Sequence, residues 1–146
     1  DGPECKNLQR KADELGVGDK VVFTGLLPPE EVAAILKQSD IFTLASYHFD
    51  NQPMSILEAI ASGLPIVYCD EQLTEALTVD NSLLTDGIEG EYFAKAFDTL
   101  LKDDTKRAAM SKASLKVSKE FDRSELVKQL EQTYKTLSVE KHVDTL

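Results

Sequence analysis

Two acidic residues border a short segment whose residue types are suited to binding a phosphorylated sugar. Asp50 precedes this segment, and Glu58 lies inside an otherwise apolar helical run. Pro53 stands near the predicted start of the helix, where a proline fits well and the following N–H groups have no partner inside the helix. Such N–H groups and the helix dipole together attract anions, most often phosphates. We therefore predict that the N–H groups of Met54, Ser55 and Ile56 are unpaired and form an anion site, to which the Ser55 hydroxyl could contribute.

Glu58 lies further along the same predicted helix. A carboxylate there can accept two hydrogen bonds from neighbouring hydroxyls, as acidic residues do for ribose in dinucleotide-binding folds. Asp50, on the preceding loop, would meet another part of the same ligand. A phosphate beside a diol, with further hydroxyls beyond, describes a nucleotide sugar.

A purely structural interpretation of these residues stays open. A proline at a helix start needs no ligand, and glutamate is common in helices. The small residues Ala59, Ala61, Ser62 and Gly63 could equally permit close packing of the helix against a sheet. The local residues alone name no substrate.

The elements that must position these residues alternate between strand and helix patterns. Runs of β-branched, aromatic and other apolar residues predict strands over 21–24, 41–46, 65–69 and 82–85. Helical spacing of apolar residues predicts helices within 3–15 and 27–40, and over 53–62, 90–102, 104–119 and 124–138. Asp103 or Asp104, and Asp122 or Ser124, are expected as N-caps. The run 41–46 is almost continuously apolar, which is typical of a parallel strand buried on both faces. The fold class predicted is α/β, a doubly wound parallel sheet.

No internal repeat, low-complexity segment or flexible linker divides the chain, so we expect one domain over 1–138 and a fraying tail over 139–146. The first residue is Asp1 rather than methionine, and a Gly-Pro turn opens directly into a helix. A strand usually precedes such a turn, and we therefore expect the chain to be a piece of a larger protein.

Composition excludes several classes of function. The chain has 146 residues, with 16 basic and 26 acidic side chains and a net charge of −10. Because phosphate-backbone binding needs a basic footprint, nucleic acid is not expected as a partner, and this segment offers no basic patch for anionic lipids.

Cys5 and Cys69 are far apart, which fits neither a disulfide framework nor a metal site, and free thiols suit the cytoplasm. His48 and His142 lack the helical spacing of a zinc site, and His48 is expected to be a loop histidine.

The segment D-N-Q-P-M-S-I-L-E-A-I-A-S-G-L-P-I-V resembles the signature of the retaining glycosyltransferases of family 4, in their carboxy-terminal GT-B domain. That signature has two glutamates, the second of which opens the pattern E-A-x-A-x-G-x-P-V-V. Residues 58–67 match this pattern closely, whereas Asp50 stands where the first glutamate is usual. The replacement keeps the charge and shortens the side chain.

Further segments extend the resemblance from Asp1 to about Tyr134. "DGPE" is similar to the end of the family's G-(D/E)-G-P-E turn, and "VVFTGLLPPEEV" is similar to its V-x-F-x-G-x-(V/L)-x-x-(E/D)-(E/D)-(V/L) unit. "EQLTEAL" stands where G-G-x-x-E-x-(V/L) is usual, with Glu75 matched and the glycines lost. "NSLLTD" stands for the family's N-G-x-L-V strand, with Ser82 in place of glycine.

The resemblance implies a role for each matched residue. Glu58 would hold the ribose hydroxyls, and Asp50, the candidate catalytic residue, would hold hydroxyls of the donor sugar. The donor-binding residues implied are Glu58, Asn51, Gln52, Pro53, Met54, Ser55, Gly25, Leu26 and Leu27. In this set the backbone amides of 52–55 would receive the diphosphate and the sugar, and the loop 25–27 would flank the nucleobase. Two structural alternatives stay open: Gly25 as a simple turn glycine and Asp50 as a solvated loop acid.

The resemblance also implies the reaction. A hexose would pass from a nucleotide-diphosphate sugar, with UDP-glucose or UDP-galactose as the expected donor, to a lipid or polysaccharide acceptor with retention of configuration. No cofactor and no metal are implied. The family's basic residues for the diphosphate lie upstream of Asp1, and its acceptor site and a catalytic histidine belong to the amino-terminal GT-B domain. The piece alone is therefore expected to be inactive. The full-length protein would be cytoplasmic or peripheral at the inner membrane face, touching the membrane only through the other domain.

The alternative is a non-catalytic nucleotide-sugar-binding or regulatory module with the same fold, for which the changes at Asp50 and Ser82 leave room. In this domain type the first strand lies beside the strand that 41–45 would form. A domain truncated at its N-terminal side should therefore show three or four parallel strands with an exposed edge, or a dimer that covers the edge.

Overall fold

The computed structural model describes residues 2–48 and 51–143. The chain forms two compact units, Asp1–Ala34 and Ile35–Leu146, each with its own internal contacts. The helix α2 (Pro29–Gln38) begins in the first unit and ends in the second.

The first unit contains one long helix and a helical turn. Helix α1 spans Cys5–Glu14, and the 3₁₀ helix η1 spans Gly18–Lys20. Gly16 has a φ of 68°, which glycine adopts freely, and the Val17 N–H donates to the Ala12 carbonyl at 3.0 Å. This is the helix ending that the sequence predicted at Gly16. Ala12 is the one buried hydrophobic side chain among the described residues of this unit.

The strand predicted over 21–24 is not formed. These residues have no ladder partner among the residues that the structure describes, and Val22 is 84% exposed. A β-branched run favours an extended backbone, but a strand exists only where a neighbour supplies hydrogen bonds. Val21 has an extended backbone, with φ −110° and ψ 123°, but the pattern did not show that the run lacks a partner strand.

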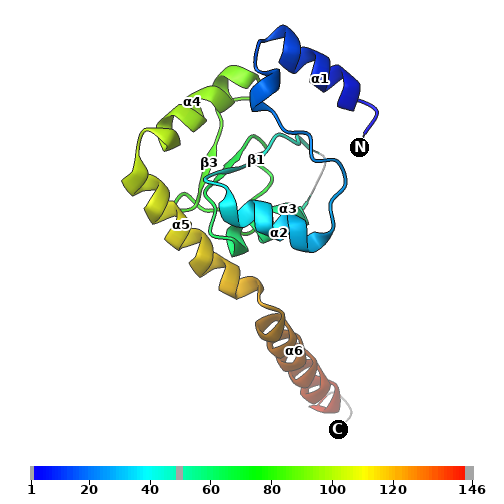
Figure 1. Ribbon diagram of the computed structural model, residues 1–146. Helices are drawn as coiled ribbons and strands as arrows, with labels where there is room; N and C mark the ends of the chain where they lie inside the picture. Colours follow the sequence, from blue (N-terminus) through cyan, green and yellow to red (C-terminus); the bar gives the residue numbers. More distant parts are fainter. Residues whose placement is uncertain (1, 49–50, 144–146) are drawn as a thin grey trace. The chain divides into compact units, whose positions relative to one another are not determined.

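The second unit contains the sheet and most of the helices (Figure 1). Its elements after α2 are β1 (Phe42–Leu44), α3 (Met54–Ala61), β2 (Ile66–Tyr68), β3 (Ser82–Leu84), α4 (Gly90–Leu101), α5 (Asp104–Ser118), η2 (Lys119–Phe121) and α6 (Arg123–Val143). The strands lie within the predicted runs but are shorter, and α6 continues beyond the predicted end at residue 138. Asp103 caps α5 as predicted, since its side chain accepts from the Lys106 N–H at 2.8 Å.

The three strands form one parallel sheet in the order β1-β2-β3. Phe42 pairs with Ile66, and Ile66 pairs with Ser82. The chain returns between β1 and β2 through α3, as parallel pairing requires. The predicted α/β class with a parallel sheet is confirmed, and the strand number agrees with the expected three or four.

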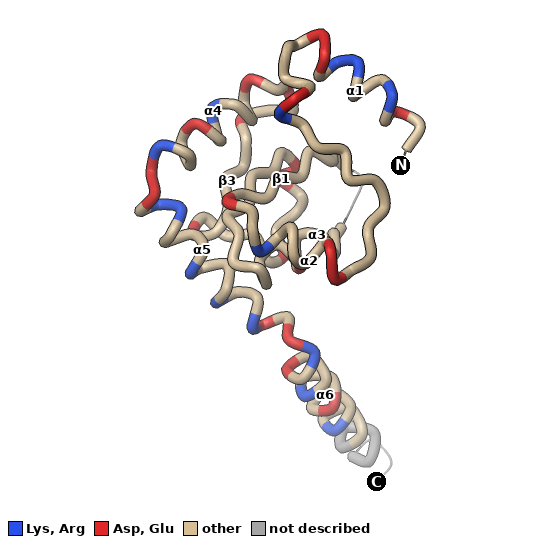
Figure 2. The backbone as a smooth tube through the Cα atoms, in the orientation of Figure 1, with Lys and Arg blue, Asp and Glu red and all other residues tan. Residues whose placement is uncertain are grey.

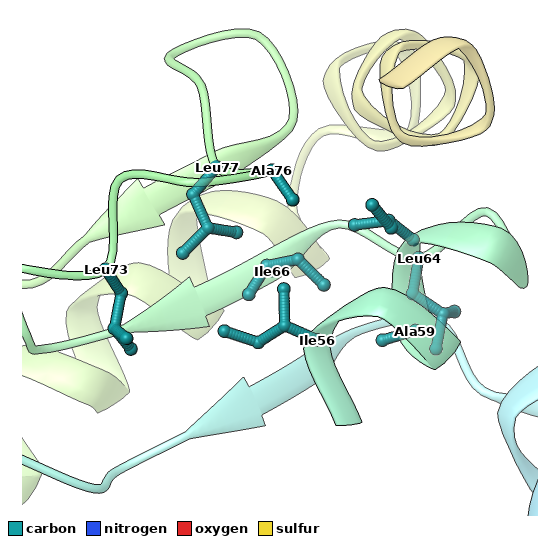
Figure 3. Packing of buried hydrophobic residues seen from close by; sticks show 8 residues of the cluster. Ile56, Ala59, Leu64, Ile66, Leu73, Ala76 and Leu77 are labelled. Carbon is teal, nitrogen blue, oxygen red and sulfur yellow. The ribbon is translucent and has the colours of Figure 1, made fainter. Parts of the chain in front are cut away.

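Two apolar clusters lie on opposite faces of β2, because successive side chains of a strand point to opposite sides. Ile66 belongs to a cluster with Ile56 and Ala59 of α3. Figure 3 shows these side chains together with Leu73, Ala76 and Leu77, which come from the connection between β2 and β3. Val67 belongs to a second cluster, with Phe93, Ala96 and Leu100 of α4 and Met110 of α5. Helices therefore cover both faces of the central strand.

The prediction that the strand within 41–46 is buried on both faces is wrong. Phe42 and Leu44 are half-buried, and Thr43 between them is exposed. Strand β1 is an edge of the described sheet, with β2 as its single partner there. An edge strand shares fewer neighbours than a central strand, so the apolar run that indicated full burial is only partly covered.

Two contacts from α5, one at Gly63 and one at Leu64, hold the turn from α3 into β2. Gly63 has a φ of 77°, and a Cβ added there would lie 3.2 Å from Leu115 of α5. The buried Ser114 hydroxyl of α5 donates to the Leu64 carbonyl at 2.7 Å. The helix α5 thus holds the end of α3 and the start of β2, the two elements on which the candidate site depends.

Charged residues lie on the helices and connections, whereas the three strands contain none (Figure 2). No helix within the described ranges is long and apolar enough to cross a membrane. In the same ranges, no group of three or more His, Cys, Asp or Glu side chains is arranged to hold a metal ion.

Candidate functional site

Three loops leave the carboxyl ends of the parallel strands and meet at one edge of the sheet. Residues 45–53 follow β1 and lead into α3, residues 69–81 follow β2, and residues 85–89 follow β3. In open α/β sheets, ligands bind at this edge, outside the carboxyl ends of the strands. The fold therefore brings the segment that the sequence singled out to the expected side of the sheet.

The start of α3 offers two backbone donors rather than three. Pro53 is the N-cap residue, with φ −66° and ψ 125°, and no side chain caps the helix. The Ile56 N–H donates to the Pro53 carbonyl at 3.0 Å, so the prediction that it is unpaired is wrong. The first turn has tightened, which satisfies one donor locally. The N–H groups of Met54 and Ser55 have no acceptor among residues 2–48 and 51–143.

Glu58 lies on the exposed side of α3, while Ile56, Ala59 and Ile60 are buried against the sheet. Its carboxylate has no ion pair or hydrogen bond with another described residue. The Glu58 backbone carbonyl accepts from Ser62 and continues the helix. An exposed carboxylate without a described partner is compatible with a ligand-facing role and does not fit a buried, paired structural glutamate.

The other predicted site residues fall into three groups. Asp50 lies outside the described residues, so its role stays a prediction. Asn51 and Gln52 are exposed, and Pro53 and Ser55 are half-buried, in the segment that leads into α3. The loop 25–27 belongs to the first unit, with a φ of 64° at Gly25, and the structure does not define its position relative to Glu58.

A cavity of about 150 Å³ lies at the same strand ends. Tyr47 after β1, Cys69 after β2, and Thr85 and Asp86 after β3 contribute to its lining. The Thr85 hydroxyl donates to the Gly87 carbonyl at 2.7 Å, and Asp86 forms an exposed ion pair with Lys95 at 3.0 Å. Each of the three strand ends thus contributes to one hollow, which is large enough for part of a ligand.

Burial makes the thiol that borders this cavity a poor nucleophile. Cys69 is 5% exposed, and its Sγ lies 3.6 Å from the Ser46 carbonyl, a weak S–H···O hydrogen bond. Burial raises the pKa of the Cys69 thiol, and the negative charge of Asp70 raises it further. Because the thiolate is the reactive form, this thiol is expected to react more slowly at neutral pH than an accessible cysteine.

Sequence reasoning missed the carboxylate that joins two of these loops. Asp70 is 1% exposed. Its Oδ2 accepts from the His48 N–H at 2.6 Å, and its Oδ1 accepts from the Gln72 N–H at 3.0 Å. The available signal was an aspartate directly after the strand predicted over 65–69, a position at the ligand-binding edge of a parallel sheet.

The family comparison agrees with the fold and the motifs. The family model described as "Glycosyl transferases group 1" matches residues 1–117. The chain is 31% identical over 137 residues to the D-inositol 3-phosphate glycosyltransferase of Corynebacterium urealyticum, covering 92% of this chain and 32% of that protein. It is 39% identical over 67 residues to the alpha-monoglucosyldiacylglycerol synthase of Streptococcus pneumoniae, covering 46% of this chain and 15% of that protein.

Solved structures show the same fold. A sucrose-phosphate synthase from Thermosynechococcus elongatus superimposes with a TM-score of 0.80 at 20% identity, over 94% of this chain and 35% of that one. HepE of Anabaena, solved in complex with UDP, gives a TM-score of 0.78 at 23% identity, over 92% and 36% of the two chains.

These likenesses define a carboxy-terminal GT-B domain. The chain belongs to the glycosyl transferases group 1 family, family 4 of the glycosyltransferases. It spans about a third of the length of its inositol-phosphate relative.

Proposed function

We propose that this chain is the donor-binding half of a retaining glycosyltransferase that transfers a hexose from a nucleotide-diphosphate sugar. The observation that carries the proposal is the pairing of features on α3. The Met54 and Ser55 N–H groups at its start have no acceptor among the described residues, and the Glu58 carboxylate further along is exposed and has no partner among them. The first feature suits a phosphate and the second suits a ribose diol.

In this proposal the Met54 and Ser55 N–H groups receive the diphosphate, Glu58 accepts from the ribose hydroxyls, and Asp50 accepts from hydroxyls of the sugar. Breaking the bond to the anomeric carbon leaves negative charge on the diphosphate. Preoriented donors that stabilise this charge are usually the largest contribution to the rate. Closure of the amino-terminal GT-B domain over the site would position the acceptor and exclude water, so this chain alone would be inactive.

We propose UDP-glucose or UDP-galactose as the donor and a lipid as the acceptor. One relative is named for a diacylglycerol glycolipid, which supports the lipid acceptor, and a structure with the same fold contains UDP, which supports the nucleotide of the donor. With a lipid acceptor, the whole protein would act in the cytoplasm at the inner face of the membrane.

The second candidate is a non-catalytic module that binds a nucleotide sugar and regulates a partner. The replacement of the family's first glutamate by Asp50 and of a strand glycine by Ser82 supports it. Ser82 is accommodated without a clash in the structure, since its buried hydroxyl donates to the Thr78 carbonyl at 2.7 Å. The change at Ser82 therefore does not argue against donor binding.

Calorimetric titration of the chain with UDP tests the binding half of the proposal. Glu58→Gln keeps the shape and removes the charge. We expect UDP affinity to fall by about 1–3 kcal/mol, the contribution of a hydrogen bond to a charged acceptor. Glu131→Gln is the matched control, since Glu131 is an exposed helical glutamate on α6. Equal UDP affinity in the two variants, or a large drop in melting temperature for Glu58→Gln, would contradict the ribose role.

The reaction is tested with the whole protein, a panel of labelled nucleotide sugars, and lipid and saccharide acceptors. Transfer from a UDP-hexose to a lipid is the expected result, and Asp50→Ala should abolish most of it. A protein that binds UDP but transfers no sugar would favour the regulatory module. An active protein that tolerates Asp50→Ala would remove Asp50 from the site.

A further inference from the structure

We propose that Asp70 is a positioning residue that holds the loop between β1 and α3 in the conformation that receives the diphosphate. The inference rests on the proposed function and adds a residue that the family signature does not contain. Asp70 touches no part of the proposed ligand in this scheme. It acts through the backbone of His48.

The contacts of Asp70 explain why a carboxylate is buried at this edge of the sheet. A charge that is 1% exposed is costly unless it is fully hydrogen-bonded. No Lys or Arg side chain of the described residues forms an ion pair with it, and each of its oxygens instead accepts a backbone N–H. The donors, His48 and Gln72, belong to the loops after β1 and after β2. Asp70 therefore clamps two loops together at the carboxyl ends of adjacent strands.

The clamped loop is in a conformation that needs support. His48 has a φ of 54°, in the left-handed region that is unfavourable for residues other than glycine. Such a conformation persists where surrounding contacts impose it. The His48 N–H donates to Asp70 at 2.6 Å, the His48 ring stacks on Tyr47 with centroids 4.0 Å apart, and the Ser46 carbonyl contacts the Cys69 thiol.

The hydrogen bond between Asp70 and His48 lies close in sequence to the backbone groups proposed to bind the diphosphate. In sequence, His48 lies five residues before Pro53, the N-cap residue of α3, and the Met54 and Ser55 N–H groups have no acceptor among residues 2–48 and 51–143. A bare carboxylate near a diphosphate would repel it. Because both oxygens of Asp70 are occupied by N–H groups, the residue can hold the loop with part of its charge compensated.

The test combines amide hydrogen exchange with UDP titration. Asp70→Asn keeps the shape but leaves one acceptor oxygen for two donors. We expect the His48 or Gln72 amide to exchange roughly 10- to 100-fold faster, as for the loss of a charge-assisted hydrogen bond, and UDP affinity to fall severalfold. Asp98→Asn is the control, because it removes the same charge from an exposed position on α4 and should change neither quantity.

A rescue variant separates positioning from a merely structural role. Glycine adopts a positive φ without strain. Adding His48→Gly to Asp70→Asn should therefore recover part of the lost UDP affinity, although it makes no new contact. If Asp70→Asn binds UDP as Asp98→Asn does, or if His48→Gly recovers nothing, Asp70 does not position the site.

Amide hydrogen exchange in the unsubstituted chain tests the same inference without requiring that a variant folds. UDP should slow exchange of the His48 amide and leave that of Leu100, buried against the far face of β2, unchanged. No response at His48 in a chain that binds UDP would overturn the inference. A chain that does not bind UDP would overturn the proposed function and the ligand step of this inference together. The exchange rates of Asp70→Asn would then still decide whether Asp70 holds His48.

Discussion

Two apolar runs of this chain have similar composition, but only one of them forms a strand of the sheet. Residues 21–24 read V-V-F-T, and β2 with its flanking residues reads P-I-V-Y-C. The second run is the central strand of a parallel sheet, with Ile66 and Val67 fully buried on its two faces. The first is unpaired among the described residues, and its four residues are exposed. The difference shows that strand propensity sets a local backbone preference, and that neighbours on both sides convert it into a strand.

The two compact units show the same contrast. In the first unit, Ala12 is the one buried hydrophobic side chain among the described residues. The second unit has two clusters, on either side of β2. Helix α1 forms in the first unit nonetheless, because its hydrogen bonds are local. Local structure needs no large core, whereas the sheet does.

Amide hydrogen exchange should show the largest difference between the two runs. The amides of β2 lie in a ladder bonded on both sides, and they should exchange only on global unfolding, with a free energy of about 5 kcal/mol or more. In the run 21–24, the Val21 N–H has a long bond of 3.4 Å to Gly18, and we expect exchange there near the rate of an unfolded peptide. Strong protection of Val22 and Phe23 would mean that a partner strand pairs with this run in solution.

A matched pair of truncations should give the next largest effect. Val67→Ala removes two methyl groups from a fully buried site between β2 and α4, and we expect a loss of about 2 kcal/mol in unfolding free energy. Val22→Ala makes the same chemical change at a position that is 84% exposed, and the expected change is within about 0.5 kcal/mol. Urea unfolding of both variants provides the comparison. Equal losses would show that the run 21–24 is buried in solution.

Much of the fold could be predicted from patterns that local rules control. Helix spacing located the α-helices α1 to α6, the Gly16 ending and the Asp103 cap were predicted, and alternation of strand and helix predicted the parallel sheet. Pairing and burial were harder to predict because they depend on residues distant in sequence. An unpaired run at 21–24 and a partly exposed β1 have the same sequence signal as buried strands.

The site could be predicted in part. The helix start and the exposed Glu58 follow from the motif and the helical period. The hydrogen bond from the Ile56 N–H to Pro53 could not be foreseen, because it depends on how tightly the first turn winds. Asp70 was missed for a different reason: its partners are backbone groups of two loops, and backbone donors have no sequence signature.

The two cysteines allow a chemical comparison of the units. Cys69 should react with iodoacetamide about ten-fold more slowly than half-buried Cys5 at neutral pH, since burial limits access and favours the protonated thiol. The pKa of Cys69 is raised in the folded state. Its contribution to stability is therefore complete below the ordinary thiol pKa and is lost as the pH rises through the raised value. Mass spectrometry of timed reactions measures both rates, and urea-unfolded protein is the control in which the two thiols should react alike.

The smallest expected difference lies at the helix starts. Asp103 caps α5 by accepting from the Lys106 N–H, so Asp103→Ala should cost about 1 kcal/mol. Glu4 precedes α1 but caps no backbone N–H, and its carboxylate accepts instead from the exposed Asn7 side chain at 2.9 Å. Glu4→Ala should therefore change the unfolding free energy by less than about 0.5 kcal/mol. Urea unfolding followed by circular dichroism measures the unfolding free energy of both variants. Asp103→Asn is the control, because it retains an acceptor oxygen for the cap. A cost at Glu4 equal to that at Asp103 would show that α1 depends on its first turn as strongly as α5 does, and that the first unit is no less tightly constrained than the second.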